Sequence, residues 1–192
     1  MRPLVQGVGI NEGTYPTRVN GSIIKEYSLW ASMLKRCYNK IHHITEPTYI
    51  SCSVSDNFKV YSYFYEWCQK QIGFNVLGYD LDKDLLHKGN KEYSENNCVF
   101  IPKELNYLLV KCNASRGLLP IGVSKNKLRY SASCTVDCKK KHLGTFDTPE
   151  LAFNVYKTFK EAHIKELAEK YKDTIDPRAY QALLNYEVDI ND

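Results

Sequence analysis

Three aspartates alternate in the segment DLDKD, where Asp80, Asp82 and Asp84 are each separated by one residue. Alternate residues of an extended strand share a face, so a strand here would bring the three carboxylates together. Carboxylates this close repel one another unless a cation neutralises them, and a hard divalent ion such as Mg²⁺ would do so. A calcium-binding EF-hand loop is excluded, because Leu85 stands where that loop needs Gly and Lys91 where it needs Glu. The remaining alternatives are a divalent metal site and a solvated acidic strand face.

The positive charge of the chain is concentrated in one segment. Residues 111–147 hold eight Lys or Arg against two Asp or Glu, a net charge of +6, whereas residues 1–110 carry +1 and residues 148–192 carry −3. Such a concentration predicts a polyanion-binding surface, and a solvated basic loop is the alternative.

The composition is that of an ordinary globular protein. The chain has 192 residues, 43% hydrophobic and 25% charged, which fits one large domain or two small ones. It has no apolar run near the ~18 residues of a membrane span, and its start lacks the apolar core of a signal peptide. We therefore expect a cytoplasmic protein without a membrane partner. Its seven cysteines form no regular framework, so reduced thiols are expected rather than disulfides.

Helical spacing of apolar side chains marks the first half of the chain, after a start that lacks periodicity. Polar side chains can cap the second of the helices that this spacing predicts. The expected elements are an extended arm over 1–26, a helix over 27–39, a helix from Asp56 or Asn57 to about Gly73, a short helix from Lys103 to Val110, and a linker over 111–117.

Period-two alternation marks the second half. Thr148 and Pro149 give a strong helix start, as N-cap and first helical residue. A three-stranded sheet can bury one face under this helix, which leaves the other face open for basic side chains. The expected elements are strands over 119–125, 130–138 and 140–146, a helix from Pro149 to about Tyr171, and a short helix after Asp176. The expected buried face of the long helix comprises Leu151, Ala152, Val155, Tyr156, Phe159 and Ala162.

The segment IGVSKNKLRYSASCTVDCKKKHLGTFDTPELAFNVY resembles the Apetala-type DNA-binding domain of plant ethylene-response factors. The matching positions are Gly122, Val123, Tyr130, Ala132, the run Leu143-Gly144-Thr145-Phe146, Asp147, Thr148, Glu150 and Ala152. The resemblance implies that the open sheet face lies in the major groove of double-stranded DNA. The DNA-facing candidates that it implies are Ser124, Asn126, Ser133, Thr135, Lys140 and His142.

This chain has Ser, Thr, Asn and His where the plant domains use arginines and tryptophans, so bidentate base reading by arginine is not expected. Phosphate contacts from the basic side chains are expected instead. These are Lys125, Lys127, Arg129, Lys139, Lys140 and Lys141.

The stretch from Tyr79 to Asn106, with the helices before it, resembles the ββα-metal core of HNH endonucleases in phage-borne proteins that join such a core to an Apetala-type domain. The resemblance implies one Mg²⁺ or Mn²⁺ ion held by Asp82 or Asp84 together with Asn106, and it makes Asn97 the residue that orients the general base. The family's usual His beside the early Asp is replaced here by LDKDLL. The base is then His87, or Asp82 if its pKa is raised. The alternative for His87 is an exposed loop residue.

A structural zinc site is not favoured. Cys37, Cys52 and Cys98 could approach one another with His42 or His43, but the chain has no CxxC pair. A free buried cysteine behaves as a small hydrophobe.

The sequence therefore predicts an α+β protein with two domains. An N-terminal helical, ββα-metal HNH-like domain over 27–110 precedes a three-stranded antiparallel sheet packed on one long helix over 118–175, with a short helix and tail over 176–192. The predicted function is sequence-directed DNA binding with metal-dependent phosphodiester cleavage, in the host cytoplasm if a phage encodes it. The alternative is a catalytically inactive HNH-derived protein that binds DNA or inhibits a host protein.

Overall fold

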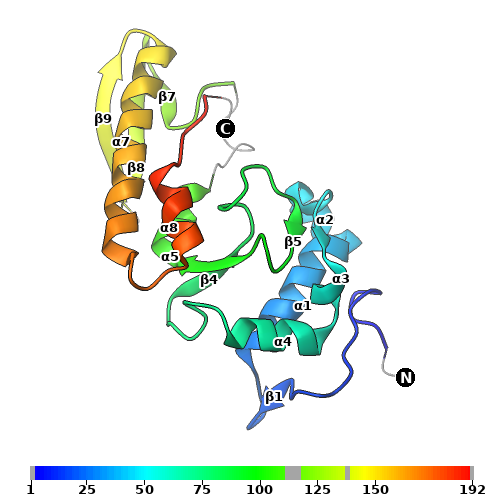
Figure 1. Cartoon of the computed structure of the whole chain (residues 1–192). Helices are drawn as coiled ribbons and strands as arrows, with labels where there is room; N and C mark the ends of the chain where they lie inside the picture. The colour runs from blue at the N-terminus through cyan, green and yellow to red at the C-terminus, as the bar shows by residue number, and fades with distance from the viewer. Residues whose placement is uncertain (1–2, 111–117, 137–138, 191–192) are drawn as a thin grey trace. The chain divides into compact units, whose positions relative to one another are not determined.

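The computed structural model describes residues 3–110, 118–136 and 139–190 (Figure 1). The chain divides into two compact units, Met1–Ile101 and Pro102–Asp192. Both mix helices with short sheets, as the α+β prediction requires. The predicted linker over 111–117 lies outside the described residues. The helix that was predicted to close the first domain belongs to the second unit, because the division falls before it.

The first unit is built on short elements around an aromatic core. Its helices are α1 (Lys25–Tyr38), α2 (Lys40–Thr45), the 3₁₀ turn η1 (Pro47–Tyr49), α3 (Asp56–Lys59) and α4 (Tyr61–Gln69). Its strands are β1 (Arg18–Val19), β2 (Ser22–Ile23), β3 (Ser53–Val54), β4 (Tyr79–Asp82), β5 (Glu92–Tyr93) and β6 (Val99–Pro102). β1 pairs with β2, β3 runs parallel to β5, and β4 pairs with β6.

Aromatic side chains form this core, most of them at helical spacing on α1, α3 and α4, and Phe100 joins them from β6. Trp30, Phe58, Phe64 and Phe100 are fully buried. Phe58 packs edge-on against Phe64, with ring centroids 5.1 Å apart. The Trp30 indole N–H donates to the Phe58 carbonyl at 2.8 Å, so the ring's polar edge is satisfied inside the core. These rings are therefore core residues of the first unit.

The N-terminal arm divides the second predicted helix in two. Ile10 donates to the Lys59 carbonyl and accepts from the Tyr61 N–H, at 2.8 and 2.9 Å. Val60 between them is extended, with φ −91° and ψ 118°, so α3 ends and α4 begins at this residue. The N-cap of α3 is Ser55, whose hydroxyl accepts from Phe58 N, and not the predicted Asp56 or Asn57.

The second unit packs a three-stranded antiparallel sheet on a long helix. Its elements are α5 (Lys103–Leu109), β7 (Val123–Asn126), β8 (Arg129–Val136), β9 (Lys139–Phe146), α7 (Pro149–Tyr171) and α8 (Pro177–Leu184). The strand order is β7-β8-β9, and α7 runs alongside the sheet (Figure 1). Thr148 caps α7 by accepting from Leu151 N, which confirms the predicted helix start. No helix in the described ranges is long and apolar enough to cross a membrane.

Two predictions for this unit were wrong in detail. The first strand begins at Val123 rather than at residue 119, because Pro120–Gly122 form a turn in which Val123 N bonds to the Pro120 carbonyl. The predicted buried face of α7 holds for Ala152 and Tyr156 and in part for Phe159. The exposed residues of that predicted face are Leu151, Val155 and Ala162, and the residues buried along α7 are Ala152, Phe153, Tyr156, Lys160, Ile164, Leu167 and Ala168.

Candidate nucleic-acid interface and acidic segment

The two faces of the β7-β8-β9 sheet differ in chemistry. Ala132 and Cys134 of β8 are buried in the cluster that α7 covers. Ser131, Ser133 and Thr135 alternate with them and therefore lie on the opposite face. We call this the open face. On the central strand, this face carries the hydroxyl side chains of Ser131, Ser133 and Thr135.

A β-bulge decides which β9 side chains join the open face. Ala132 pairs with Gly144 but Ser133 pairs with His142, so Leu143 is left without a partner between them. The extra residue shifts the alternation by one. Thr145, which pairs with Ser131, and His142, three residues before it, consequently lie on the same side of the sheet.

The open face is hollowed, and none of the described residues that line the hollow is a carboxylate. The hollow has a volume of about 380 Å³, and its lining residues are Ser124, Lys125, Asn126, Ser131, Ser133, Lys140 and His142. Six of the positions predicted from the sequence to contact DNA therefore share one concave surface. The hydroxyl of Ser131 was missed, although its period-two spacing from Ser133 could have identified it.

Hydrogen bonds connect the polar groups across all three strands. Asn126 Nδ2 donates to Ser131 Oγ at 3.2 Å, Ser131 Oγ lies 3.3 Å from Thr145 Oγ1, and Thr145 Oγ1 lies 3.5 Å from His142 Nε2. Hydroxyl, amide and imidazole groups can each donate and accept. The chain of contacts holds these groups in place on one surface.

The alternation separates three lysines that the sequence had grouped. Lys140 pairs with Thr135 and lines the hollow. Lys141 pairs with the buried Cys134, and its ammonium lies 4.7 Å from the centroid of the Phe159 ring on α7. Lys139 is two residues before Lys141 in the same strand and therefore lies on the same side of the sheet as Lys141. Of the three, Lys140 is thus the one on the open face.

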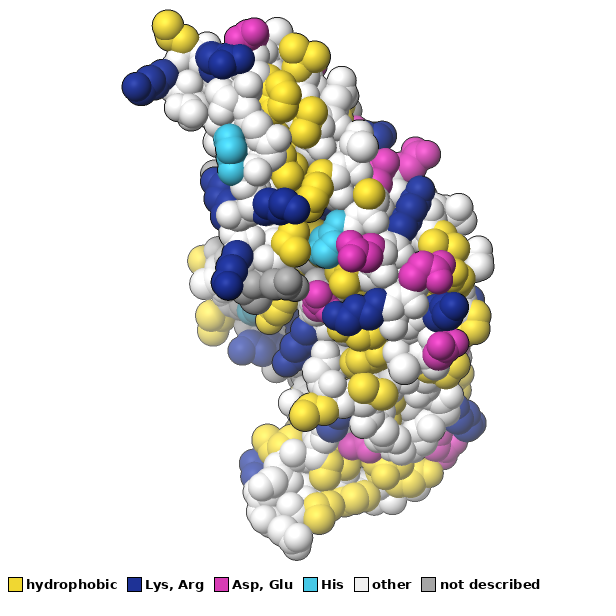
Figure 2. Space-filling model, turned by 90° about the vertical axis from the view of Figure 1, so that its left-hand side faces the viewer, with side chains coloured by type: hydrophobic (Ala, Val, Ile, Leu, Met, Phe, Trp, Pro, Cys, Tyr) yellow, Lys and Arg dark blue, Asp and Glu magenta, His cyan; other side chains and the backbone are white. Residues whose placement is uncertain are grey.

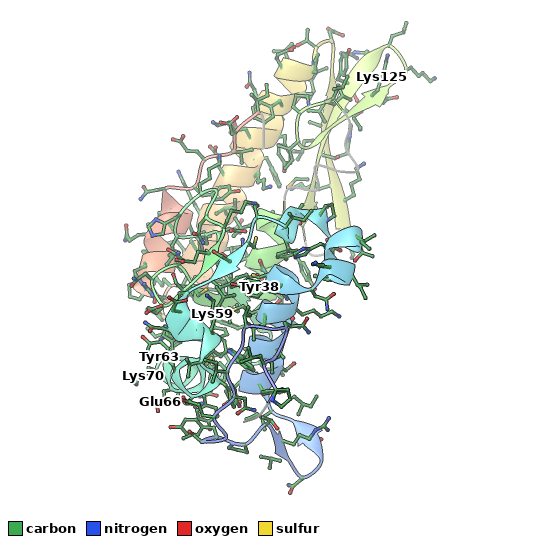
Figure 3. All side chains as sticks on the ribbon, turned by 90° about the vertical axis from the view of Figure 1, so that its right-hand side faces the viewer. Tyr38, Lys59, Tyr63, Glu66, Lys70 and Lys125 are labelled. Atoms are coloured by element: carbon green, nitrogen blue, oxygen red, sulfur yellow. The ribbon has the colours of Figure 1, made fainter. Side chains whose placement is uncertain are left out.

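The other predicted basic residues lie at the β7–β8 hairpin. Lys125 is on β7 near the turn (Figure 3), and Lys127 is in the turn itself with φ +54°. Arg129 is exposed and pairs with Asp147 at 2.8 Å. In Figure 2, most Asp and Glu side chains of this end of the molecule lie on one side, whereas Lys, Arg and His side chains occur on both sides.

The acidic segment is a strand for only part of its length. β4 ends at Asp82, so the expected alternation stops before Asp84. Asp82 Oδ1 instead accepts from the backbone N–H groups of Leu85 and Asp84, at 2.7 and 2.9 Å. Burial raises the pKa of Asp82, and these two hydrogen bonds oppose the rise only in part. The three aspartates therefore do not form one carboxylate face.

A buried lysine neutralises part of this acidic segment. Lys83 is 6% exposed, forms an ion pair with Asp84, and lies 5.5 Å from the centroid of the Tyr93 ring. Asn90 fixes the loop that follows, because its Nδ2 donates to the carbonyls of Lys83 and Glu92, both at 2.7 Å. Sequence reasoning missed Asn90, which carries no signal beyond being a turn-forming residue after Gly.

The remaining predicted site residues are spread over both units. His87 is exposed in the loop after β4. Asn97 is half-buried, and its Nδ2 lies 3.2 Å from Asn90 Oδ1. Asn106 is on α5, in the second unit. Within the first unit, the structure thus links Asn97 to the loop between Lys83 and Glu92 through Asn90.

The donor set around Asp82 suits a hard ion in type but is partly occupied. Carboxylate oxygens are the ligands that Mg²⁺ prefers, and an aspartate bound through one oxygen keeps further acceptor capacity. Over the described ranges, no three His, Cys, Asp or Glu side chains are grouped to hold a metal ion. Metal binding by Asp82, Asp84 and Asn106 therefore stays a prediction.

The buried cysteines of the first unit behave as apolar residues. Cys37, Cys52 and Cys98 are buried free thiols. Burial raises the pKa of Cys37 to about 12 and raises that of Cys98 as well. Protonated thiols in a core pack as small hydrophobes.

Comparisons of the chain with protein families, with curated proteins and with solved structures gave no match.

Proposed function

We propose that the chain binds double-stranded DNA with the open face of the β7-β8-β9 sheet. The observation that carries the proposal is the hollow of this face, whose lining, among the residues that the structure describes, consists of Lys, His, Ser and Asn side chains and includes no carboxylate. Lys140 on the open face and Lys125 at the border of its hollow supply positive charge for phosphates, which gives affinity that depends on salt. The polar side chains between them supply donors and acceptors for base edges.

A matched pair of substitutions tests the location of the interface. Thr135 and Thr158 are both exposed threonines of the second unit, the first on the open face and the second on α7. A glutamate at position 135 faces Lys140 and adds negative charge where phosphates would approach. Thr135→Glu should weaken binding of the full-length protein to a duplex, whereas Thr158→Glu should leave it near the parent value. Equal effects of the two substitutions in a fluorescence-anisotropy titration would contradict the proposed face.

Cleavage is a second candidate function, and the raised pKa of Asp82 favours it. A general base works best when its pKa lies near the working pH, and an ordinary aspartate lies far below it. Burial moves Asp82 in the required direction, while His87 is an exposed loop residue. In this proposal Asp82 accepts the proton of the attacking water. A bound Mg²⁺ or Mn²⁺ would stabilise the leaving oxygen of the phosphodiester.

Nicking of supercoiled plasmid with Mg²⁺ or Mn²⁺ tests this second function. Asp82→Asn should abolish nicking, since loss of a positioned base typically costs ~10²–10⁴-fold in rate. His87→Ala should leave it unchanged. DNA binding should survive both substitutions, because neither residue is in the second unit. If the parent protein binds DNA but does not nick it, cleavage is refuted and the non-catalytic alternative takes its place.

A further inference from the structure

The tip of the β7–β8 hairpin presents one large apolar side chain to solvent. Asn126 pairs with Arg129, so Lys127 and Leu128 form the two-residue turn between the strands. Leu128 is 94% exposed. Lys127 holds the left-handed conformation, with φ +54°, which is unfavourable for an L-residue. Turns of this kind usually hold Gly, Asn or Asp, and none of these occupies the two central positions.

The surroundings of Leu128 are cationic. Lys125 and Lys127 precede it and Arg129 follows it, and all three are exposed. The carboxylate of Asp147, at the end of β9, is held by Arg129 at 2.8 Å. Neighbouring Lys125 and Asn126 line the hollow of the open face, so the turn adjoins the proposed DNA interface directly. A partner here must offer negative charge on both sides of an apolar surface.

We infer that Leu128 is a wedge that inserts at a base step of the DNA bound on the open face. The inference rests on the proposed DNA binding and adds a residue that acts on the stacking of bases. Duplex DNA has the required pattern, since phosphates flank the apolar faces of the stacked bases. Architectural proteins use Leu, Ile, Phe or Met side chains in this way, partly unstacking one step and kinking the duplex.

Distorted DNA provides a test that needs no knowledge of a target sequence. Insertion of a wedge requires free energy to unstack a base step, so a duplex that is already unstacked at one step should bind more tightly. The probes are two labelled duplexes with the same base pairs, one intact and one with two additional unpaired nucleotides that form a bulge in one strand. The full-length parent should prefer the bulged duplex by about tenfold, which corresponds to about 1.4 kcal/mol and requires that only part of the cost of unstacking one step be avoided.

Three variants assign that preference to one side chain. Leu128→Ala should lose the preference, and Leu128→Phe should keep it, since an aromatic ring also inserts between bases. Leu118→Ala is the control, because Leu118 is also fully exposed in the second unit but lies outside the sheet. Thermal melting checks that each variant folds; the substituted side chains touch solvent, so no loss of stability is expected.

The outcomes separate the wedge from the interface. A parent that binds both duplexes equally, or a preference that survives Leu128→Ala, overturns the wedge and leaves the proposed DNA binding standing. Equal weakening of both complexes by Leu128→Ala also overturns it, since that result indicates an apolar contact without unstacking. A parent that binds neither duplex refutes the proposed function itself.

Discussion

Replacing Lys140 with alanine should weaken DNA binding in a salt-dependent way, whereas replacing its neighbour Lys141 should not. The two lysines are adjacent in sequence and equal in charge, so any effect of net charge alone is the same for both. The structure separates them by strand alternation: Lys140 lines the open face, and Lys141 lies on the α7 side against the Phe159 ring. The pair therefore tests the geometry of the sheet and not only its charge.

The expected magnitudes follow from one phosphate contact. Each phosphate neutralised by a cation contributes about 0.9 to the slope of log affinity against log salt. Lys140→Ala should therefore flatten the slope by about 0.9, and the ratio of parent to variant affinity should be about 3.5-fold larger at 50 mM than at 200 mM salt. Lys141→Ala instead removes a cation–π contact at 4.7 Å, which should lower the free energy of unfolding by about 0.5–1 kcal/mol.

Fluorescence anisotropy of a labelled duplex at several salt concentrations measures the slope, and urea unfolding of the same samples measures stability. The reasoning fails if Lys141→Ala flattens the salt dependence as much as Lys140→Ala does. That result would mean that charge density, and not the placement of Lys140 on the open face, determines binding.

Three further predictions concern stability. Gly122→Ala should destabilise the second unit by about 2–5 kcal/mol in thermal or urea unfolding. Residue 122 has φ +77°, and an added Cβ would lie 2.1 Å from the Tyr156 ring. Wild-type stability of the variant would contradict this and would show that the turn can move. Burial raises the pKa of Asp82, so its carboxyl favours the folded state at low pH and disfavours it once the pH exceeds the folded-state pKa. Asp82→Asn keeps the acceptor oxygen and should raise the urea midpoint at pH 7 while leaving it unchanged at pH 3, and a loss at pH 7 would contradict this. Partial burial alone would raise the pKa of Glu95, but the hydrogen bonds that its carboxylate accepts outweigh the effect of burial and lower the pKa. The shortest of these hydrogen bonds comes from Asn57 at 2.7 Å. The stability that Glu95 contributes is therefore present above its ordinary pKa and lost as the pH falls through the folded-state value, so Glu95→Gln should destabilise at pH 7 and much less at pH 3; an equal effect at both would rule out the charge as its cause.

The elements that local sequence fixes were predicted well. Thr148 and Pro149 define the start of α7 without help from the rest of the chain, since a capping hydroxyl and a preset φ act within one turn. The same holds for α1, whose apolar residues recur at helical spacing, and for the three short strands with period-two patterns. These signals depend on neighbours a few residues apart, and such neighbours are visible in a sequence.

Contacts between distant segments decided the rest. The break between α3 and α4 arises because Ile10 takes the hydrogen bonds on either side of Val60, fifty residues away in the chain. Nothing in the sequence near Val60 indicates this break. The aspartates were likewise predicted as one face because alternation was assumed to continue, but the strand ends at Asp82 and Lys83 turns inward to pair with Asp84.

The sequence by itself determined that the chain has a basic segment of alternating strands beside a well-capped helix, because charge and periodicity are local properties. Only the tertiary structure decided which basic side chains share a face. The bulge at Leu143 shifts the register of β9 by one residue, and a shift of one residue moves a side chain to the other side of a sheet. Lys140 and His142 consequently face the hollow together with Ser131 and Ser133, while Lys141 packs against α7.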